Sequence, residues 1–469
     1  MMTTLWSALG ENSSVVLESP GLSLTGKELL EHIKNRAAKL HSCGFAPKQR
    51  IGFVFRRNSQ SIIEFLALMY LGCIPFPLNP YFTLARLKQL IEDLQFAAFF
   101  SDPATIHILA QTAKGYEIGG KDIENFLLSK ADYKLLDTIE HKAAIGILTS
   151  GSTGMPKVVM HAGESIIKNA SLHAQAIALA AEDRVAMTMP CYFSFGIVAN
   201  LLGTLLNRSC LVVFESSDVG AIVRTNWLQE NKIQVLNTTP AMLADLCSAR
   251  ADFLKIVTVG GDQVSFDLAK KALKNWPRAK FYATYGLSEA GPRVATWQFD
   301  AASLNKSGQT LLGKPLAGVE LRISGSKDEG ELIVKTPTAM LGYFLNPIET
   351  LKVLNTETKE IKTGDIVRKD LDGNYLLIGR SKRIICRGGE KIHPGEIERS
   401  LQKIPHIKDA FVSPMPDERL GQVPEAFIIA DAILTAESIR RSLRSFLPST
   451  QLPVKFHFVD KLPQEAMRK

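Results

Sequence analysis

The sequence has little of what marks a secreted, membrane-spanning or metal-cluster protein. Its six cysteines are scattered without a Cys-x-x-Cys pair, which favours a reducing compartment and argues against a metal cluster: they are Cys43, Cys73, Cys191, Cys210, Cys247 and Cys386. The most apolar run begins at Ile62, contains Glu64 and is broken by Pro75, so it is shorter than the ~20 residues of a membrane span. The N-terminal stretch has no cationic segment followed by an apolar one. We therefore expect no secretory signal, no membrane span and a cytoplasmic protein.

The sequence also lacks a dense basic block. Its net charge of +8 is modest for 469 residues. This excess fits either a well-solvated surface or a weak positive field that favours anionic ligands such as nucleotides. No helix-turn-helix, zinc-finger spacing or basic stripe interleaved with aromatics is present, so we expect no nucleic-acid partner.

The length and the rhythm of the chain predict a multidomain α/β protein. Cores stop growing near ~250–300 residues, so 469 residues predict at least two domains. Amphipathic periodicity predicts helices over residues 24–40, 165–181 and 219–232, and apolar runs such as residues 50–55 predict buried strands between helices. This alternation is typical of parallel sheets.

From about Gly313 the pattern changes to short strands separated by Asp-Gly and Ser-Gly turns, which predicts a β-rich subdomain. A smaller segment of strands and helices follows residue 380. The predicted fold is α/β. A large N-terminal domain (1–380) contains mainly parallel α/β sheets and the β-rich subdomain (313–380), and a small α+β C-terminal domain (381–469) follows it.

The strongest local pattern is Leu148-Thr-Ser-Gly-Ser-Thr-Gly-Met-Pro-Lys157. Glycines let the backbone bend so that several N–H groups point at one phosphate, while the hydroxyls add donors and Lys157 adds a cation. It is not a Walker A loop, because Lys157 follows Pro156. The alternative interpretation is a plain surface loop. The apolar strand before the loop and the Pro-Lys sequence at its end argue against this alternative. The predicted phosphate-binding residues are Thr149, Ser150, Gly151, Ser152, Thr153, Gly154 and Lys157.

This string resembles the phosphate loop of the adenylate-forming superfamily, which includes acyl- and aryl-CoA synthetases, peptide-synthetase adenylation domains and luciferases. Other motifs of the superfamily follow in its order. Tyr285-Gly-Leu-Ser-Glu289 is similar to its Tyr-Gly-x-Thr/Ser-Glu, which implies that Tyr285 stacks on adenine and that Glu289 holds Mg²⁺. The resemblance also places further residues in the ATP/AMP site: Gly261, Asp262, Gly286 and Ser288.

Two later motifs extend the resemblance into the C-terminal part of the chain. Asp365 and Arg380 look like the superfamily's ribose-binding pair, and Lys382 falls at its hinge. The thiol-transfer loop, which enters the site after the mobile C-terminal domain rotates, would comprise Arg387, Gly388, Gly389, Glu390 and Lys391. Glycine there permits close passage of a pantetheine arm. We interpret His393 as a surface histidine in a turn.

The last residue, Lys469, aligns with the superfamily's catalytic lysine, which contacts the carboxylate and the α-phosphate. Three positions depart from the superfamily: Val158 and Arg468 replace glycines, and Arg383 stands where an acidic residue is common. If the chain ends at Lys469, the C-terminal carboxylate of this residue could pair with its own ammonium group and make adenylation less efficient. The alternative is that the sequence is a truncated form of a longer natural chain.

The acyl-binding region is predicted around Pro190-Cys-Tyr-Phe-Ser-Phe-Gly196, which resembles Pro-x-x-His-x-x-Gly of CoA ligases with Phe193 in place of histidine. The predicted acyl-pocket residues are Phe193, Phe195, Gly196, Gly260 and Leu287. These aromatic side chains favour an apolar or aromatic acid. We interpret Arg293 as a structural residue, and a partner for a second carboxylate of the acid is the alternative.

Together these motifs predict an ATP-dependent acid–thiol ligase that acts on a small carboxylic acid. The acid would form an acyl-adenylate with Mg²⁺ and ATP, assisted by Lys157, Glu289 and Lys469, and the acyl group would pass to CoA. Two alternatives stay open. The acceptor could be the phosphopantetheine of a carrier protein acting in trans, or the departures could mark a catalytically weak nucleotide-binding scaffold. A luciferase-like oxygenase has no specific support.

Overall fold

The computed structural model describes residues 2–113, 115–119, 126–149, 157–215, 220–262, 264–307, 311–325, 328–380, 383, 385–387, 390–417, 420–447 and 449–463. The chain forms two compact units. The first comprises residues 1–320 and 334–361, and the second comprises residues 321–333 and 362–469. Compactness alone does not locate a hinge, so the boundary at residue 380 stays a prediction.

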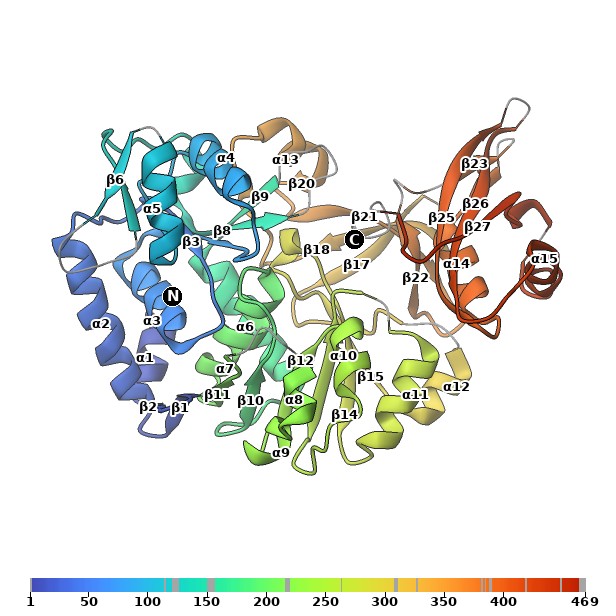
Figure 1. The fold of residues 1–469 in the computed structure, drawn as a ribbon, viewed down its shortest axis with the longest axis horizontal. Helices are drawn as coiled ribbons and strands as arrows, with labels where there is room; N and C mark the ends of the chain where they lie inside the picture. Colours follow the sequence, from blue (N-terminus) through green and yellow to red (C-terminus); the bar gives the residue numbers. More distant parts are fainter. Residues whose placement is uncertain are drawn as a thin grey trace. The chain divides into compact units, whose positions relative to one another are not determined.

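The first unit contains a nine-stranded sheet, ordered β16-β15-β14-β13-β12-β10-β11-β1-β2 (Figure 1). Its centre is parallel from β1 to β14, and its edges are antiparallel. The strands are β1 (Val15–Ser19), β2 (Leu22–Thr25), β10 (Arg184–Met187), β11 (Cys210–Val213), β12 (Val235–Thr238), β13 (Ile256–Gly260), β14 (Lys280–Tyr285), β15 (Ala295–Phe299) and β16 (Lys314–Pro315).

Both faces of this sheet are buried. Leu211 and Val213 pack in one apolar cluster, with helices α1, α2, α3, α6 and α7, whereas Val212 between them packs in another, with α8 to α12. The helices of the first unit are α1 (Met2–Gly10), α2 (Gly26–Ser42), α3 (Ser59–Leu71), α4 (Leu84–Leu94), α5 (Pro103–Thr112), α6 (Gly163–Ala176), α7 (Gly203–Leu206), α8 (Gly220–Arg224), α9 (Trp227–Glu230), α10 (Pro240–Leu246), α11 (Phe266–Asn275), α12 (Ala301–Ser307) and α13 (Pro347–Val353). Two-sided burial explains the near-continuous apolar runs of these strands.

Two smaller sheets complete the first unit. One is ordered β4-β3-β5-β7-β6 and the other is the antiparallel three-stranded sheet β19-β9-β8. Their strands are β3 (Arg50–Val54), β4 (Ile74–Leu78), β5 (Ala98–Phe100), β6 (Tyr116–Ile118), β7 (Phe126–Ser129), β8 (Ala143–Thr149), β9 (Lys157–Ala162) and β19 (Gly342–Tyr343). The short strand β20 (Leu354–Asn355) pairs with Glu360 and Ile361.

The second unit contains two groups of strands. The pairs β21–β22, β23–β24 and β25–β26 are antiparallel, and β27 pairs parallel with β26. Helix α14 packs on β25, and the buried apolar residues of α14, α15 and β23 to β26 form one core. The elements are β17 (Glu320–Gly325), β18 (Glu329–Lys335), β21 (Glu360–Lys369), β22 (Tyr375–Arg380), β23 (Ile385–Arg387), β24 (Glu390–Ile392), α14 (Pro394–Gln402), β25 (Ile407–Asp417), β26 (Gly421–Ala430), α15 (Ala436–Leu443) and β27 (Lys455–Phe458).

These elements confirm the predicted α/β class and the short strands after residue 313. The prediction of one helix over residues 219–232 is wrong: the chain forms α8 and α9, separated by Asn226 in the left-handed region (φ 51°). Between Phe195 and Gly203, residues Gly196–Leu202 form a π-helix that periodicity did not predict. Among the described residues, no helix combines the length and the apolar character needed to cross a membrane, and no group of three His, Cys, Asp or Glu side chains forms a metal site.

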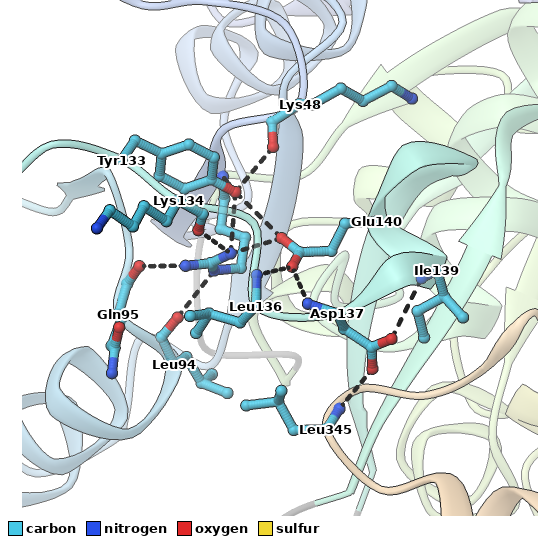
Figure 2. A network of polar contacts seen from close by, with 11 residues as sticks. Lys48, Leu94, Gln95, Tyr133, Lys134, Leu136, Asp137, Ile139, Glu140 and Leu345 are labelled. Carbon is cyan, nitrogen blue, oxygen red and sulfur yellow. Dashed lines mark hydrogen bonds and ion pairs between the residues drawn. The ribbon is translucent and has the colours of Figure 1, made fainter.

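A buried ion pair fixes the small sheet that contains β3. Arg50 Nη1 lies 2.5 Å from Glu140 Oε2, and both side chains are almost fully buried. Figure 2 shows the surrounding network: Tyr133 donates to Glu140, whose second oxygen accepts the N–H groups of Leu136 and Asp137. Asp137 in turn accepts the N–H of Leu345 (2.9 Å). The network therefore reaches the segment that follows β19.

Candidate active site

The two arms of the predicted phosphate loop are strands β8 and β9. They form an antiparallel pair in which Thr149 lies opposite Lys157, and Thr149 Oγ1 donates to the Lys157 carbonyl (3.2 Å). The residues between them, 150–156, lie outside the described residues, so the phosphate-binding roles of Ser150, Gly151, Ser152, Thr153 and Gly154 stay predictions. The hairpin brings both ends of the loop to one place.

Lys157 is the centre of a charged cluster. Its ammonium lies 2.7 Å from Glu349 Oε2 on α13 and 4.9 Å from the centroid of the Tyr343 ring. Glu349 Oε1 also pairs with Lys352 (2.6 Å). The hydrogen bond from Lys157 lowers the pKa of Glu349 to about 2, so its carboxylate stays ionised at neutral pH. Lys157 retains further N–H donors for a phosphate group.

Tyr343 connects this cluster to Glu289. Its hydroxyl donates to Glu289 Oε1 at 2.6 Å. Burial, followed by the charge of Glu289, raises the pKa of Tyr343 above its usual range, so the hydroxyl keeps the proton that it donates. The backbone fixes both partners: Tyr343 lies opposite Val159 in the β19–β9 pair, and Met340 N donates to the Glu289 carbonyl (2.8 Å). Lys157 and Glu289, 132 positions apart in the sequence, are thus joined through one aromatic residue.

The Tyr285–Glu289 turn follows β14 and ends in a short 3₁₀ helix at Ser288–Ala290. His161 on β9 lies beneath it and donates from Nε2 to the Ser288 carbonyl (2.7 Å). Burial lowers the pKa of His161 to about 4, so the imidazole is neutral. Gly286 is required sterically, because a Cβ there would lie 1.7 Å from the Pro292 carbonyl oxygen.

The Gly260-Gly261-Asp262 turn lies at the same sheet edge. Gly260 pairs with Thr284 in the parallel β13–β14 register, which places the turn beside Tyr285. Gly261 adopts φ 88°, a conformation that favours glycine. The predicted adenine-side residues therefore lie together, as expected where parallel strands end at one edge. Their contacts with a nucleotide stay predictions.

The predicted acyl-pocket residues differ in exposure. Phe195 is buried and packs with Met189 and Ala199, and Gly196 is so close to the Pro190 carbonyl that a Cβ would clash with it. Phe193 is 51% exposed, and its ring centroid lies 4.6 Å from that of Tyr192. Leu287 is partly buried. Phe193 thus keeps a free face, and its role in closing the pocket stays a prediction.

In the second unit, the predicted ribose pair is brought together. Asp365 and Arg380 are opposite each other in the β21–β22 register, and Arg380 Nε lies 2.6 Å from Asp365 Oδ1. Asp365 is buried, whereas the Arg380 side chain is 60% exposed. The pair presents a carboxylate and a guanidinium side by side, and its binding of a ribose stays a prediction.

The hinge and the thiol-transfer loop are described only in part. Lys382, Gly388, Gly389, Arg468 and Lys469 lie outside the described residues. Arg387, on β23, pairs in register with Glu390 on β24, and Lys391 follows on the same strand. Their functional roles stay predictions.

The departure at residue 383 has a structural explanation. Arg383 Nη2 lies 2.5 Å from Glu398 Oε1 and donates to the Val412 carbonyl, and its guanidinium lies over the Phe411 ring (4.7 Å). By contrast, the interpretation of His393 as a surface residue is wrong. It is 7% exposed, at the N-terminus of α14, with Nε2 3.4 Å from Glu329 Oε1.

Sequence reasoning missed the residues that support the motifs. They are His161, Asn169, Thr338, Tyr343 and Glu349. One signal was available: Asn346-Pro-Ile-Glu349 has the N-cap, Pro and Glu pattern of a helix start, and Asn346 caps α13. That pattern predicts a helix but not its pairing with a lysine 192 residues away.

Comparison with known proteins identifies the family of the chain. The chain is similar to a 2-succinylbenzoate–CoA ligase of Bacillus pumilus (27% identity; 95% of this chain and 91% of that protein). It is also similar to a feruloyl-CoA synthase of an Amycolatopsis species (26%; 94% and 91%). Its fold matches ATP-bound MatB from Rhodopseudomonas palustris with a TM-score of 0.85 (20% identity; 99% of this chain and 98% of that chain). The family model of AMP-binding enzymes matches residues 6–344, and that of their C-terminal domain matches residues 396–469. The chain therefore belongs to the family of AMP-binding enzymes.

Proposed function

We propose that this protein is an ATP-dependent carboxylate–CoA ligase that forms an acyl-adenylate intermediate. One observation supports the proposal most strongly: Tyr343 contacts both Lys157 and Glu289. Lys157 is the predicted cation of the phosphate loop, and Glu289 is the predicted metal-binding carboxylate. The relatives named as CoA ligases and CoA synthases support the same activity.

The first step joins the acid to AMP. A carboxylate oxygen of the acid attacks the α-phosphorus of ATP, and the bond to the β-phosphate oxygen breaks, releasing pyrophosphate. Negative charge builds on the phosphoryl oxygens, and Lys157 and Lys469 would stabilise it. Glu349 orients the Lys157 ammonium at 2.7 Å, so that this cation is positioned before ATP arrives.

The donor set fits Mg²⁺ bound with the nucleotide. Among the described residues, only Oε1 of the Glu289 side chain accepts a hydrogen bond, which leaves Oε2 for a hard cation that prefers carboxylate oxygen and water. Tyr343 would fix the carboxylate in that orientation. When bound, the ion would neutralise phosphate charge.

The second step transfers the acyl group to a thiol. The sulfur of the pantetheine arm attacks the acyl carbonyl, AMP leaves with the electron pair, and the thiol proton is lost. We propose CoA as the acceptor, because the relatives are CoA ligases and synthases. Loading of a carrier protein is not favoured by these relatives. The C-terminal domain would rotate about Lys382 between the two steps, bringing in the loop with Gly388 and Gly389.

The scaffold alternative loses two of the three departures that suggested it. Two of the departures that suggested it have structural roles: Val158 is buried opposite Leu148 in the β8–β9 pair, and Arg383 pairs with Glu398. The apolar surroundings of Phe195 support an apolar or aromatic body for the acid.

Acid-dependent exchange of pyrophosphate into ATP tests the proposal. We expect exchange with at least one class in a panel of aryl, short-chain and long-chain acids, and its loss in Lys469→Ala. Absence of exchange with every acid, in folded protein that binds ATP by calorimetry, would contradict the ligase function.

A further inference from the structure

Arg293 is a buried cation without a carboxylate partner among the described residues. The residue is 3% exposed. Its guanidinium makes one hydrogen bond within that part of the chain, from Nη1 to Thr284 Oγ1, and lies over the Phe195 ring with its central carbon 4.0 Å from the centroid. Nε is buried without a partner. Enclosing a charge in this way costs several kcal/mol unless an anion compensates it.

The charge of Arg293 persists at neutral pH. Burial lowers its pKa to about 9, which still leaves the guanidinium protonated at pH 7. The nearby His173 gives no compensating charge, because an imidazole is neutral or positive; burial, and then the charge of Arg293, lowers its pKa to about 3. A counter-charge for Arg293 must therefore come from a bound molecule or from outside the described residues.

The backbone of Arg293 is fixed in place. Asn169 on α6 accepts the Arg293 N–H (2.9 Å) and donates to its carbonyl (2.8 Å), and Thr338 accepts a second hydrogen bond from the same Asn169 amide (3.0 Å). All three residues are buried. The backbone that carries the guanidinium is thus fixed, as in a preorganised binding group.

Arg293 lies at the predicted acyl pocket. A Cβ added to Gly260 would lie 2.9 Å from Arg293 Nη1 and 3.1 Å from the Phe195 ring. Three groups therefore meet next to Gly260, which has no side chain: the Arg293 guanidinium, the Phe195 ring and the Thr284 hydroxyl. The neighbouring side chains of Met189, Ala199 and Met242 are apolar. If the predicted acyl pocket forms here, its apolar surroundings and one buried cation suit an apolar acid that has a second anionic end.

From this geometry we infer that Arg293 pairs with a second carboxylate of the substrate. The substrate class is then a dicarboxylic acid with an apolar or aromatic body, of which one carboxylate is adenylated and the other stays free against Arg293. The inference rests on the proposed ligase function and makes it more specific. Arg293 is a specificity-determining residue in this account, since the reacting carboxyl lies at the other end of the acid.

Matched acids that differ by one carboxylate test the inference: 3-phenylpropanoate against its ring-carboxylated analogues, and pentanoate against glutarate and adipate. In pyrophosphate exchange we expect the wild-type protein to favour a diacid. Arg293→Met removes the charge at similar volume and should lower the ratio of diacid to monoacid kcat/KM by about 10- to 100-fold, the range of a charged hydrogen bond. Arg293→Lys should retain part of the preference.

Arg57→Met is the matched control. Arg57 is also a partly buried arginine near a phenylalanine ring (5.5 Å to Phe214), but it donates to the carbonyls of Phe214 and Thr188. It should leave the diacid to monoacid ratio unchanged.

The outcomes separate the inference from the function on which it rests. Equal or better use of monoacids by the wild-type protein overturns the inference and leaves the ligase function standing. So does an equal loss for both acids in Arg293→Met, which would indicate a structural role. If Arg293→Met does not fold, as judged by its melting transition, the inference is tested by the ratio of diacid to monoacid kcat/KM in the wild-type protein and in Arg293→Lys. No exchange with any acid contradicts the ligase function itself.

Discussion

At the scale of single residues, Glu349 has two opposing effects on Lys157. Its carboxylate orients the ammonium at 2.7 Å, but it also neutralises charge that a triphosphate would otherwise feel. The second lysine on the same carboxylate, Lys352, decides between them. Two cations on one carboxylate leave a net positive cluster, so we expect orientation to outweigh neutralisation.

Glu349→Gln should therefore lower kcat/KM for Mg·ATP by about tenfold, the lower end of a lost charge-assisted hydrogen bond. Lys157→Ala should cost more, and the double variant should be no worse than Lys157→Ala, because both changes remove one interaction. Lys352→Ala removes one of the two cations, so it should also lower kcat/KM, but by less than Lys157→Ala because Lys352 is the more exposed partner of Glu349. An unchanged or higher kcat/KM in Glu349→Gln would show that Glu349 only competes with phosphate.

The buried histidines predict a pH dependence of stability. The folded pKa values of His161 and His173, about 4 and about 3, lie below the ordinary 6.5, so the unfolded chain binds more protons in between. Stability is then complete above about pH 6.5 and falls as the pH drops towards 4. Each imidazole contributes at most about 1.4 kcal/mol per pH unit in that window.

Urea unfolding between pH 4.5 and 7.5 measures this slope. His161→Gln should reduce it, whereas His107→Gln, an exposed position on α5, should not. A free energy of unfolding that is flat across this range would contradict the buried neutral state of both histidines.

At the level of single residues, candidates could be named where a motif concentrates the chemistry within a few positions, and their roles stay predictions. Lys157 and Glu289 were predicted because each ends a short recognisable string. Tyr343 and Glu349 were not, because their roles exist only after β19 pairs with β9 and α13 follows. Arg293 was interpreted as a structural residue, and its burial could not be read from a linear pattern.

At the scale of elements, the Arg50–Glu140 pair joins β3 to the segment 133–140 (Figure 2). Removing one partner of a buried ion pair leaves the other uncompensated. Glu140→Ala should therefore lower the free energy of unfolding by about 3–5 kcal/mol in urea titration. The exposed pair Arg441–Glu437 is the comparison, and Glu437→Ala should cost less than about 0.5 kcal/mol. Similar losses in the two variants would show that the network is not a main support of this sheet.

Long amphipathic helices and buried strands could be predicted from the sequence. Interruptions within helices could not. Helix α2, predicted over residues 24–40, extends over Gly26–Ser42 with a capping box at Thr25. The break at Asn226 and the π-helix at Gly196–Leu202 depend on local backbone conformations that hydrophobic periodicity does not encode.

At the scale of the whole molecule, the proposal requires one site to serve two half-reactions. Lys469→Ala should lower acid-dependent exchange at least about 100-fold while leaving thioester formation from a supplied acyl-adenylate nearly intact. Gly388→Val, which adds bulk to the proposed pantetheine path, should do the reverse. Equal loss of both half-reactions in either variant would argue against a rotating C-terminal domain.

The central claim is that one acid is activated by ATP and transferred to CoA. The most direct measurement is mass-spectrometric quantification of all products from ATP, CoA and the acid selected by exchange. The account predicts acyl-CoA, AMP and pyrophosphate in equal amounts. Formation of AMP and pyrophosphate without acyl-CoA would contradict the assignment of CoA as acceptor, and ATP left unconsumed would contradict the ligase reaction itself.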